Sequence, residues 1–172
     1  MRALHLLLLL TFINTSYSQI NSGLSDSEQS YIEALYQSGI KKSDNKDYTG
    51  AIADFDKAIK LLPNNYLLHF NRGTVKSLIN DEMGAIADFN KAIEIQPDSA
   101  DAYFNRGVSK FKLKDNQGAL LDYDRAIKLN PNDCLFYYAR GKLKATLLNF
   151  KGGLSDIINQ LKSILLLAKV IS

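Results

Sequence analysis

The chain has 172 residues, of which 46% are hydrophobic and 23% are charged, and its formal net charge is +3. These proportions are those of an ordinary globular protein, so they exclude a wholly disordered chain and a wholly membrane-embedded one. A charge so close to balance also argues against nucleic acid as a partner, because nucleic-acid binding needs a clustered excess of lysine and arginine.

The first residues have the organisation of a secretory signal peptide. Arg2 precedes the apolar run LHLLLLLTFI at 4–13, and the small and polar stretch NTSYSQ follows it. This pattern predicts cleavage after Ser18, with residues 1–18 removed and the protein exported to a periplasm or secreted. The apolar run is shorter than the roughly 20 residues of a membrane span. An uncleaved anchor is the alternative, and it is the only membrane association that we expect.

One sequence unit then recurs along the chain. Residues 47–63 read DYTGAIADFDKAIKLLP, and close copies follow at 81–97 (DEMGAIADFNKAIEIQP) and at 115–131 (DNQGALLDYDRAIKLNP). The prolines that end these stretches recur every 34 residues, and glycines, aspartates and bulky apolar residues keep the same interval. A period of this length predicts a stack of similar structural units.

Each unit reads as two helices joined by a turn. A residue that can cap a helix precedes the second helix, and these residues are Asp47, Asp81, Asp115 and Asn149. Apolar residues follow at helical spacing, and a proline ends the helix. The first helix of the chain begins at a capping box, Ser25-x-x-Glu28. Two such short helices cannot bury their apolar faces alone, so neighbouring units must cover each other.

Small residues at fixed points of the unit indicate close contacts between helices. Glycine inside a helix costs about 1 kcal/mol relative to alanine, so its return at one position argues for a steric need. We therefore expect Gly73, Ala85 and their counterparts one period away to lie where adjacent helices approach closely.

The unit resembles the tetratricopeptide repeat, which has glycine at position 8, alanine at 20, an aromatic at 24, alanine at 27 and proline at 32. Three consecutive units carry all five residues: Gly39, Ala51, Phe55, Ala58 and Pro63; Gly73, Ala85, Phe89, Ala92 and Pro97; Gly107, Ala119, Tyr123, Ala126 and Pro131. The resemblance implies an all-α fold, a right-handed superhelical solenoid of helix-turn-helix repeats. The expected solenoid has three full units and a degenerate fourth unit with a C-terminal capping helix.

The resemblance also sets the expected boundaries. Residues 19–31 lead into the first helix, and the repeats occupy 32–65, 66–99 and 100–133. The degenerate fourth repeat covers 134–161 and the end of an apolar helix covers 162–172. The fourth unit keeps Gly141 but has Gly153, Gln160 and Leu165 where the alanines and the proline belong, so we expect it to be the least stable.

The C-terminal sequence leaves three interpretations open. Residues 157–171 read IINQLKSILLLAKVI and continue a helical apolar pattern, with leucine on several sides. The first interpretation is a cap that lengthens the last helix. The second is self-association, which would make the chain a structural subunit that assembles into homo-oligomers through this helix. The third is a chain cut short within a longer array.

Nothing in the sequence nominates a catalytic residue, a cofactor or a metal site. His69 and Cys134 lie in different units, and no phosphate-binding loop, HExxH or paired CxxC motif is present. His69 occupies a packing position, so we expect a core histidine. Cys134 has no partner for an internal disulfide, and we interpret it as a half-buried residue at a repeat boundary, with pairing between chains as the alternative. The sequence therefore favours a protein that is not an enzyme.

Three charged series follow the same period. Arg72, Arg106 and Arg140 lie beside the glycine of the first helix, and Asp54, Asp88, Asp122 and Asp156 lie beside the aromatic of the second. We predict an internal ladder of arginine–carboxylate hydrogen bonds, in which Arg72 meets either Asp54 of the preceding unit or Asp88 of its own. We interpret the third series as a solvated face, with a basic stripe that faces acidic ligands as the alternative. It consists of Lys42, Lys76, Lys110 and Lys144.

The resemblance implies a protein-binding scaffold whose inner groove is lined by the first helices. The groove candidates are Tyr36, Phe70, Asn71, Thr74, Phe104, Asn105, Val108, Tyr138 and Lys142. Such a groove suits an amphipathic or extended peptide, whose backbone the asparagines can hold. Alternatively, some of the aromatic rings pack only between helices. The family's carboxylate clamp has lysine and asparagine where this chain has Tyr36 and Ile40, so we do not expect that activity.

Overall fold

A computed structural model describes residues 24–148, and every regular element in that range is a helix. The described part of the chain divides into two compact units, residues 24–98 and 99–148, and each unit is described by itself below. The signal peptide, the second helix of the fourth repeat and the apolar C-terminus that the sequence predicts lie outside the described residues. Within 24–148, no helix is both long and apolar enough to cross a membrane.

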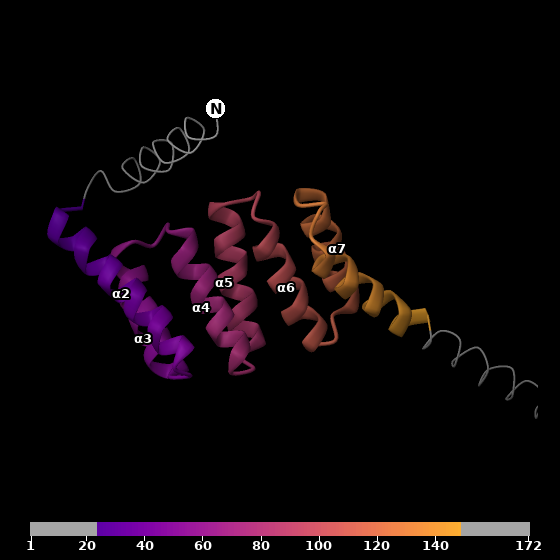
Figure 1. Cartoon of the computed structure of the whole chain (residues 1–172), viewed down its shortest axis with the longest axis horizontal. Coiled ribbons are helices and arrows are strands. Elements are labelled where there is room, and N and C mark those ends of the chain that lie inside the picture. The colour runs from indigo at the N-terminus through magenta and orange to yellow at the C-terminus, as the bar shows by residue number, and fades with distance from the viewer. Residues whose placement is uncertain (1–23, 149–172) are drawn as a thin grey trace, which may run out of the picture. The chain divides into compact units, whose positions relative to one another are not determined.

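The first unit consists of two antiparallel helix pairs (Figure 1). The first pair is α2 (Asp26–Asp44) with α3 (Tyr48–Leu61), and the second is α4 (Tyr66–Leu78) with α5 (Glu82–Ile95). Each helix packs against the next along the chain, and α2 also contacts α4. The predicted pairing of helices is therefore confirmed, and the first helices of two successive repeats are neighbours.

The predicted caps begin these helices. Ser25 and Glu28 form the capping box at the start of α2. At the start of α3, the Asp47 side chain accepts a hydrogen bond from the Gly50 backbone N–H at 3.0 Å. The same cap recurs at the start of α5, and a Cβ at Gly50 would lie only 2.2 Å from the second carboxylate oxygen of Asp47. This close approach explains why glycine stands three residues after each capping aspartate.

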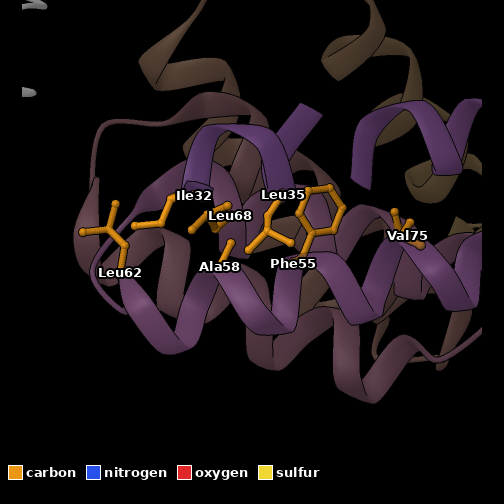
Figure 2. Close-up of a cluster of buried hydrophobic side chains, with 8 residues drawn as sticks. Ile32, Leu35, Phe55, Ala58, Leu62, Leu68 and Val75 are labelled. Atoms are coloured by element: carbon orange, nitrogen blue, oxygen red, sulfur yellow. The ribbon is translucent and has the colours of Figure 1, made fainter. Parts of the chain in front are cut away.

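The core cluster of the first unit lies where α2, α3 and α4 meet (Figure 2). Phe55 and Leu68 are almost completely buried there, together with Ile32 and Leu35 from α2. The helices touch closely at the predicted glycine, because a Cβ on Gly73 would lie 3.2 Å from the Ala85 carbonyl oxygen. The steric need inferred from the sequence is thus confirmed at this position.

The turn inside each repeat contains a strained residue that the sequence analysis did not predict. Lys46, Asn80 and Lys114 each have a φ between 62° and 67°. This left-handed conformation is uncommon for residues other than glycine and asparagine. Two of the three turns therefore hold a lysine where asparagine fits better.

The second unit contains α6 (Ala100–Lys112), α7 (Asn116–Leu129) and a helical segment at 134–148. Tyr123 and Phe136 are nearly inaccessible in its core. The Cys134 side chain is exposed, so the expectation of a half-buried cysteine is wrong. The reason lies in the helix register, because Phe136, two residues later, is the residue that turns into the core.

Candidate functional site

In the first unit, the predicted groove residues lie on α2 and α4 and are half-buried. The ring of Tyr36 is centred 6.3 Å from Phe55, and the ring of Phe70 is 5.9 Å from Phe89. Phe70 also stacks on Tyr66, with 5.5 Å between the ring centres. Each of these two groove aromatics therefore packs on the aromatic ring of the second helix in the same repeat. It stabilises the helix pair while part of its surface remains accessible to solvent.

The polar candidates on this face are partly engaged within the unit. The Nδ2 of Asn71 donates to the Leu67 carbonyl oxygen at 2.8 Å and lies 3.5 Å from the Tyr36 hydroxyl. The Thr74 hydroxyl donates to the Phe70 carbonyl oxygen at 2.9 Å. In Asn71 the Oδ1 atom therefore has the greater capacity for a ligand, as an acceptor for a peptide N–H.

In the second unit, the predicted groove residues divide into packed and exposed ones. Phe104 and Val108 are half-buried, and the ring of Phe104 lies 4.8 Å from that of Phe136. Tyr138 is 67% exposed, and Lys142 is also exposed. On α6, the Nδ2 of Asn105 donates to the carbonyl oxygen four residues earlier at 3.0 Å, as Asn71 does. The candidates thus form two sets, one in each unit.

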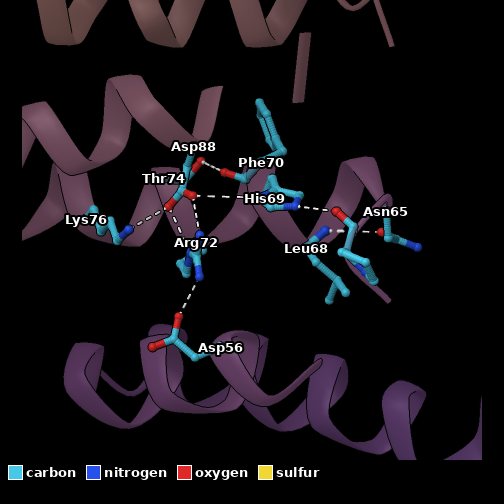
Figure 3. Close-up of polar contacts among 10 residues, drawn as sticks. Asp56, Asn65, Leu68, His69, Phe70, Arg72, Thr74, Lys76 and Asp88 are labelled. Carbon is cyan, nitrogen blue, oxygen red and sulfur yellow. Dashed lines mark hydrogen bonds and ion pairs between the residues drawn. The ribbon is translucent and has the colours of Figure 1, made fainter. Parts of the chain in front are cut away.

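An ion-pair network holds α4 to its neighbours beside the groove face (Figure 3). Arg72 donates from Nε and Nη2 to the two carboxylate oxygens of Asp88, the Nε bond being 2.9 Å long. Its Nη1 donates to Asp56 of the preceding repeat at 2.6 Å. The sequence left open whether Arg72 meets Asp54 or Asp88, and the structure shows that it binds Asp88 of its own repeat. The carboxylate from the preceding repeat is Asp56, two residues after Asp54.

Asp88 is the centre of this network. Lys76 lies 2.8 Å from one carboxylate oxygen, and His69 Nδ1 lies 3.7 Å from the other. Burial alone would raise the pKa of Asp88, but the charge-assisted hydrogen bonds from Arg72 and the ion pair with Lys76 outweigh burial and hold this pKa well below its ordinary value. Asp88 is therefore an ionised carboxylate in a buried position.

His69 is a core residue, as the sequence predicts. Its side chain is buried, and Nε2 donates to the Pro63 carbonyl oxygen at 2.8 Å. Within 24–148, no group of three or more acidic, histidine or cysteine side chains is placed to hold a metal ion.

Three members of the lysine series belong to the same network, so their interpretation as a solvated face is wrong. Lys42 lies 2.6 Å from Asp54, and Lys110 lies 2.8 Å from Asp122, as Lys76 does from Asp88. The reason is helical geometry, because these lysines follow the arginine position by four residues and share its face. Lys144 is exposed, and Asp156, which has the spacing to it that Asp122 has to Lys110, lies outside the described part of the chain.

The hydrogen-bond donor to the aspartate of each repeat depends on the residue at the arginine position. In the first repeat Ser38 stands there, and its hydroxyl donates to Asp54 at 2.6 Å. In the third, Arg106 donates from Nε and Nη2 to Asp122, at 2.9 Å and 2.6 Å. Arg140 donates to Asp124 at 2.6 Å, which parallels the bond from Arg72 to Asp56. The network is therefore a periodic structural element.

A pocket of about 300 Å³ opens in the first unit, where the N-terminal halves of α2 and α4 meet. Leu24, Ile32, Leu62, Leu67 and Leu68 form its apolar lining, and Gln29, Ser30, Glu33, Tyr36 and Asn65 supply its polar atoms. Of these residues, Tyr36 is among the groove candidates named from the sequence. No periodic signal marks the pocket, because residues outside the repeats, including Leu24, help to form it.

Two family models match the chain, one described as the tetratricopeptide repeat over residues 100–133 and one as a TPR repeat over 83–114. No curated protein matches the chain in sequence.

Several solved structures share the fold. One is the first TPR domain of human RPAP3, at 25% identity and a TM-score of 0.67, covering 71% of this chain and 96% of that one. The first TPR of Spaghetti (RPAP3), bound to the HSP90 peptide SRMEEVD, has 26% identity and a TM-score of 0.67, with 69% and 94% covered. MamA from Desulfovibrio magneticus has 25% identity and a TM-score of 0.66, with 70% and 68% covered.

The family matches, the solved structures and the periodic packing of the helix pairs agree. The glycine contact between α4 and α5, the repeated caps and the repeated ion pairs occur at the spacing that the sequence repeats set. Residues 83–133 therefore consist of tetratricopeptide repeats, and the described residues 24–148 have the all-helical fold of the solved TPR domains.

Proposed function

We propose that the protein is a non-catalytic adaptor that binds a peptide or protein segment on the face formed by the first helices of its repeats. The observation that carries this proposal is the partial solvent accessibility of the side chains on that face in the first unit. Tyr36, Phe70 and Asn71 keep part of their surface accessible although they also pack on neighbouring helices. Aromatic rings beside asparagine side chains are suited to an extended peptide, which needs apolar contacts and backbone hydrogen bonds.

The solved structures support a binding role for this kind of fold. The Spaghetti domain, which aligns with 69% of this chain, is bound to an HSP90 peptide. The identity of 26% does not carry that ligand over, and Tyr36 and Ile40 differ from the carboxylate-clamp residues. The partner that we propose is therefore a protein segment of different chemistry.

We also propose that the protein acts outside the cytoplasm, in a periplasm or after secretion. The support is the sequence of residues 1–18, with a basic start, an apolar run and small residues before the expected cleavage point. N-terminal sequencing of the protein recovered from its native cells tests this proposal. A mature N-terminus at Gln19 is the expected result, and an intact Met1 in cytoplasmic protein would contradict it.

The binding proposal is tested with peptides selected from a random display library against the purified full chain. Asn71→Ala and Asn105→Ala remove amide groups from the face without removing a core ring. Each should weaken binding about threefold to tenfold, since a hydrogen bond contributes about 0.5–1.5 kcal/mol. Affinity is measured by isothermal titration calorimetry.

Matched controls lie on the second helices of the same units. Thr49→Ala on α3 and Gln117→Ala on α7 change exposed polar residues away from the proposed face and should leave affinity unchanged. Phe70→Ala and Phe104→Ala are unsuitable as primary tests, because both rings pack on buried aromatics. Selected peptides that respond to Thr49→Ala and Gln117→Ala, and not to the asparagine variants, would refute the proposed face.

A further inference from the structure

We propose that the pocket between α2 and α4 binds a lysine or arginine side chain of the protein segment that the adaptor recognises. This inference rests on the proposed function and assigns the chemistry of one subsite. The pocket holds about 300 Å³, which is at the lower end for a ligand site. It therefore suits one long side chain better than a whole small-molecule ligand.

The interior of the pocket is aliphatic. Ile32 and Leu68 are buried in the core, and Leu67 is 37% exposed. A side chain that enters must therefore present methylene groups, because a buried polar group without a partner is penalised. The stems of lysine and arginine meet this requirement, and they commonly lie along apolar surfaces while the charge stays near water.

The charge at the pocket is negative. Glu33 is the only lining residue with a formal charge, and it is exposed. The N-terminal half of α2, from Asp26 to Gln37, also carries Asp26 and Glu28 and contains no lysine or arginine. The first half of α4, up to Asn71, has no aspartate, glutamate, lysine or arginine, and His69 faces the core. An approaching cation is therefore attracted, and a carboxylate is repelled.

Glu33 and Tyr36 are placed to share such a cation. They are three residues apart on α2, so they lie on neighbouring positions of one helix face, and both line the pocket. A cation over the Tyr36 ring gains a cation–π contact while it also pairs with Glu33. Glu33 accepts one hydrogen bond, from Gln37 at 2.8 Å, and a carboxylate has capacity for more. An aliphatic stem with a cationic end thus matches both parts of the pocket.

The test is an NMR titration of the purified full chain with three capped amino acids: Nα-acetyl-lysine N-methylamide, and the norleucine and glutamate equivalents. The lysine probe should shift the backbone amides of Tyr36, Leu67 and Leu68 in a saturable way and bind about fivefold more tightly than norleucine. The glutamate probe should bind more weakly than norleucine. Equal affinity of the lysine and norleucine probes would overturn the inference, and so would a lysine probe that leaves these amides unshifted.

A charge-neutral variant with a matched control completes the test. Glu33→Gln should reduce lysine-probe affinity about fivefold and leave norleucine binding unchanged. Glu94→Gln removes the same charge from α5 of the same unit, outside the pocket, and should have no effect. Equal affinities in Glu33→Gln and the unchanged chain would overturn the inference. If library peptides still bind through Asn71 in that case, the proposed function survives and only the pocket assignment falls.

Discussion

Replacement of Asp88 by asparagine should destabilise the first unit far more than the same replacement at Asp56, although both carboxylates bind Arg72. The Asp88 side chain is 4% exposed and the Asp56 side chain is 46% exposed. Loss of one member of a buried ion pair costs about 3–5 kcal/mol, because the remaining charge is left without its partner. Arg72 retains Asp56, so we expect the lower end of this range, about 3 kcal/mol.

Loss of the exposed partner should have a small effect. An exposed ion pair contributes about 0.2–1 kcal/mol, so we expect Asp56→Asn to reduce the free energy of unfolding by about 0.5 kcal/mol. Urea unfolding at pH 7, followed by far-ultraviolet circular dichroism, measures both variants. With a slope of about 2 kcal/mol per molar urea, the Asp88 variant should unfold at a midpoint about 1.5 M lower than the unchanged chain. Equal losses in the two variants would refute the view that burial makes Asp88 the centre of the network.

Three further predictions concern acid stability, the turn and the helix contact. Because the folded-state pKa of Asp88 is lowered, its contribution to stability is fully present above about pH 5 and is lost as the pH falls through about 4 toward the folded pKa. Stability should therefore decline less steeply with acid in Asp88→Asn than in the unchanged chain, and parallel urea-midpoint profiles from pH 6 to pH 2 would argue against this. Lys114→Asn should stabilise the second unit by about 0.5–1 kcal/mol, because asparagine tolerates the φ of 67° at this turn better than lysine; a lower thermal midpoint would contradict it. Gly73→Ala should destabilise the first unit by about 1 kcal/mol, since its Cβ would lie 3.0 Å from the Phe89 ring and overpacking outweighs the helix propensity gained; a rise in the urea midpoint would show that α4 and α5 separate easily.

Local signals made much of the fold predictable. Asp47 and Asp81 precede their helices because a cap acts within one turn, and this relation is visible in the sequence. Gly73 was identified because glycine in a helix needs a steric reason, and that reason is the contact with α5. Repetition strengthened both signals, since each local pattern occurs several times.

The ion-pair partner of each charged side chain was harder to predict from the sequence. Asp54 and Asp56 are two residues apart on α3 and face different neighbours, so Lys42 meets one and Arg72 meets the other. Their spacing alone does not indicate which carboxylate reaches the next repeat. The sequence also did not indicate that the lysine series joins the arginine–aspartate ladder. Periodicity shows that residues recur, but it does not show which residues they contact.

The helices that carry the candidate residues were predictable, and the packing of their side chains was less so. Tyr36 and Phe70 lie on the expected helices, but their packing on Phe55 and Phe89 depends on the rotation of each helix about its axis. The pocket went unrecognised in sequence because Leu24 and Leu62, which lie outside the groove pattern, complete its lining. The packed aromatics thus stabilise the fold and also lie on the face that we propose for recognition.

The most direct test of the proposed binding face is an NMR map of the full chain with a library-selected peptide bound. We expect the largest amide shifts on α2, α4 and α6, with those of Leu67, Asn71 and Asn105 among them. Shifts concentrated on α3, α5 and α7, with those three amides unchanged, would contradict it.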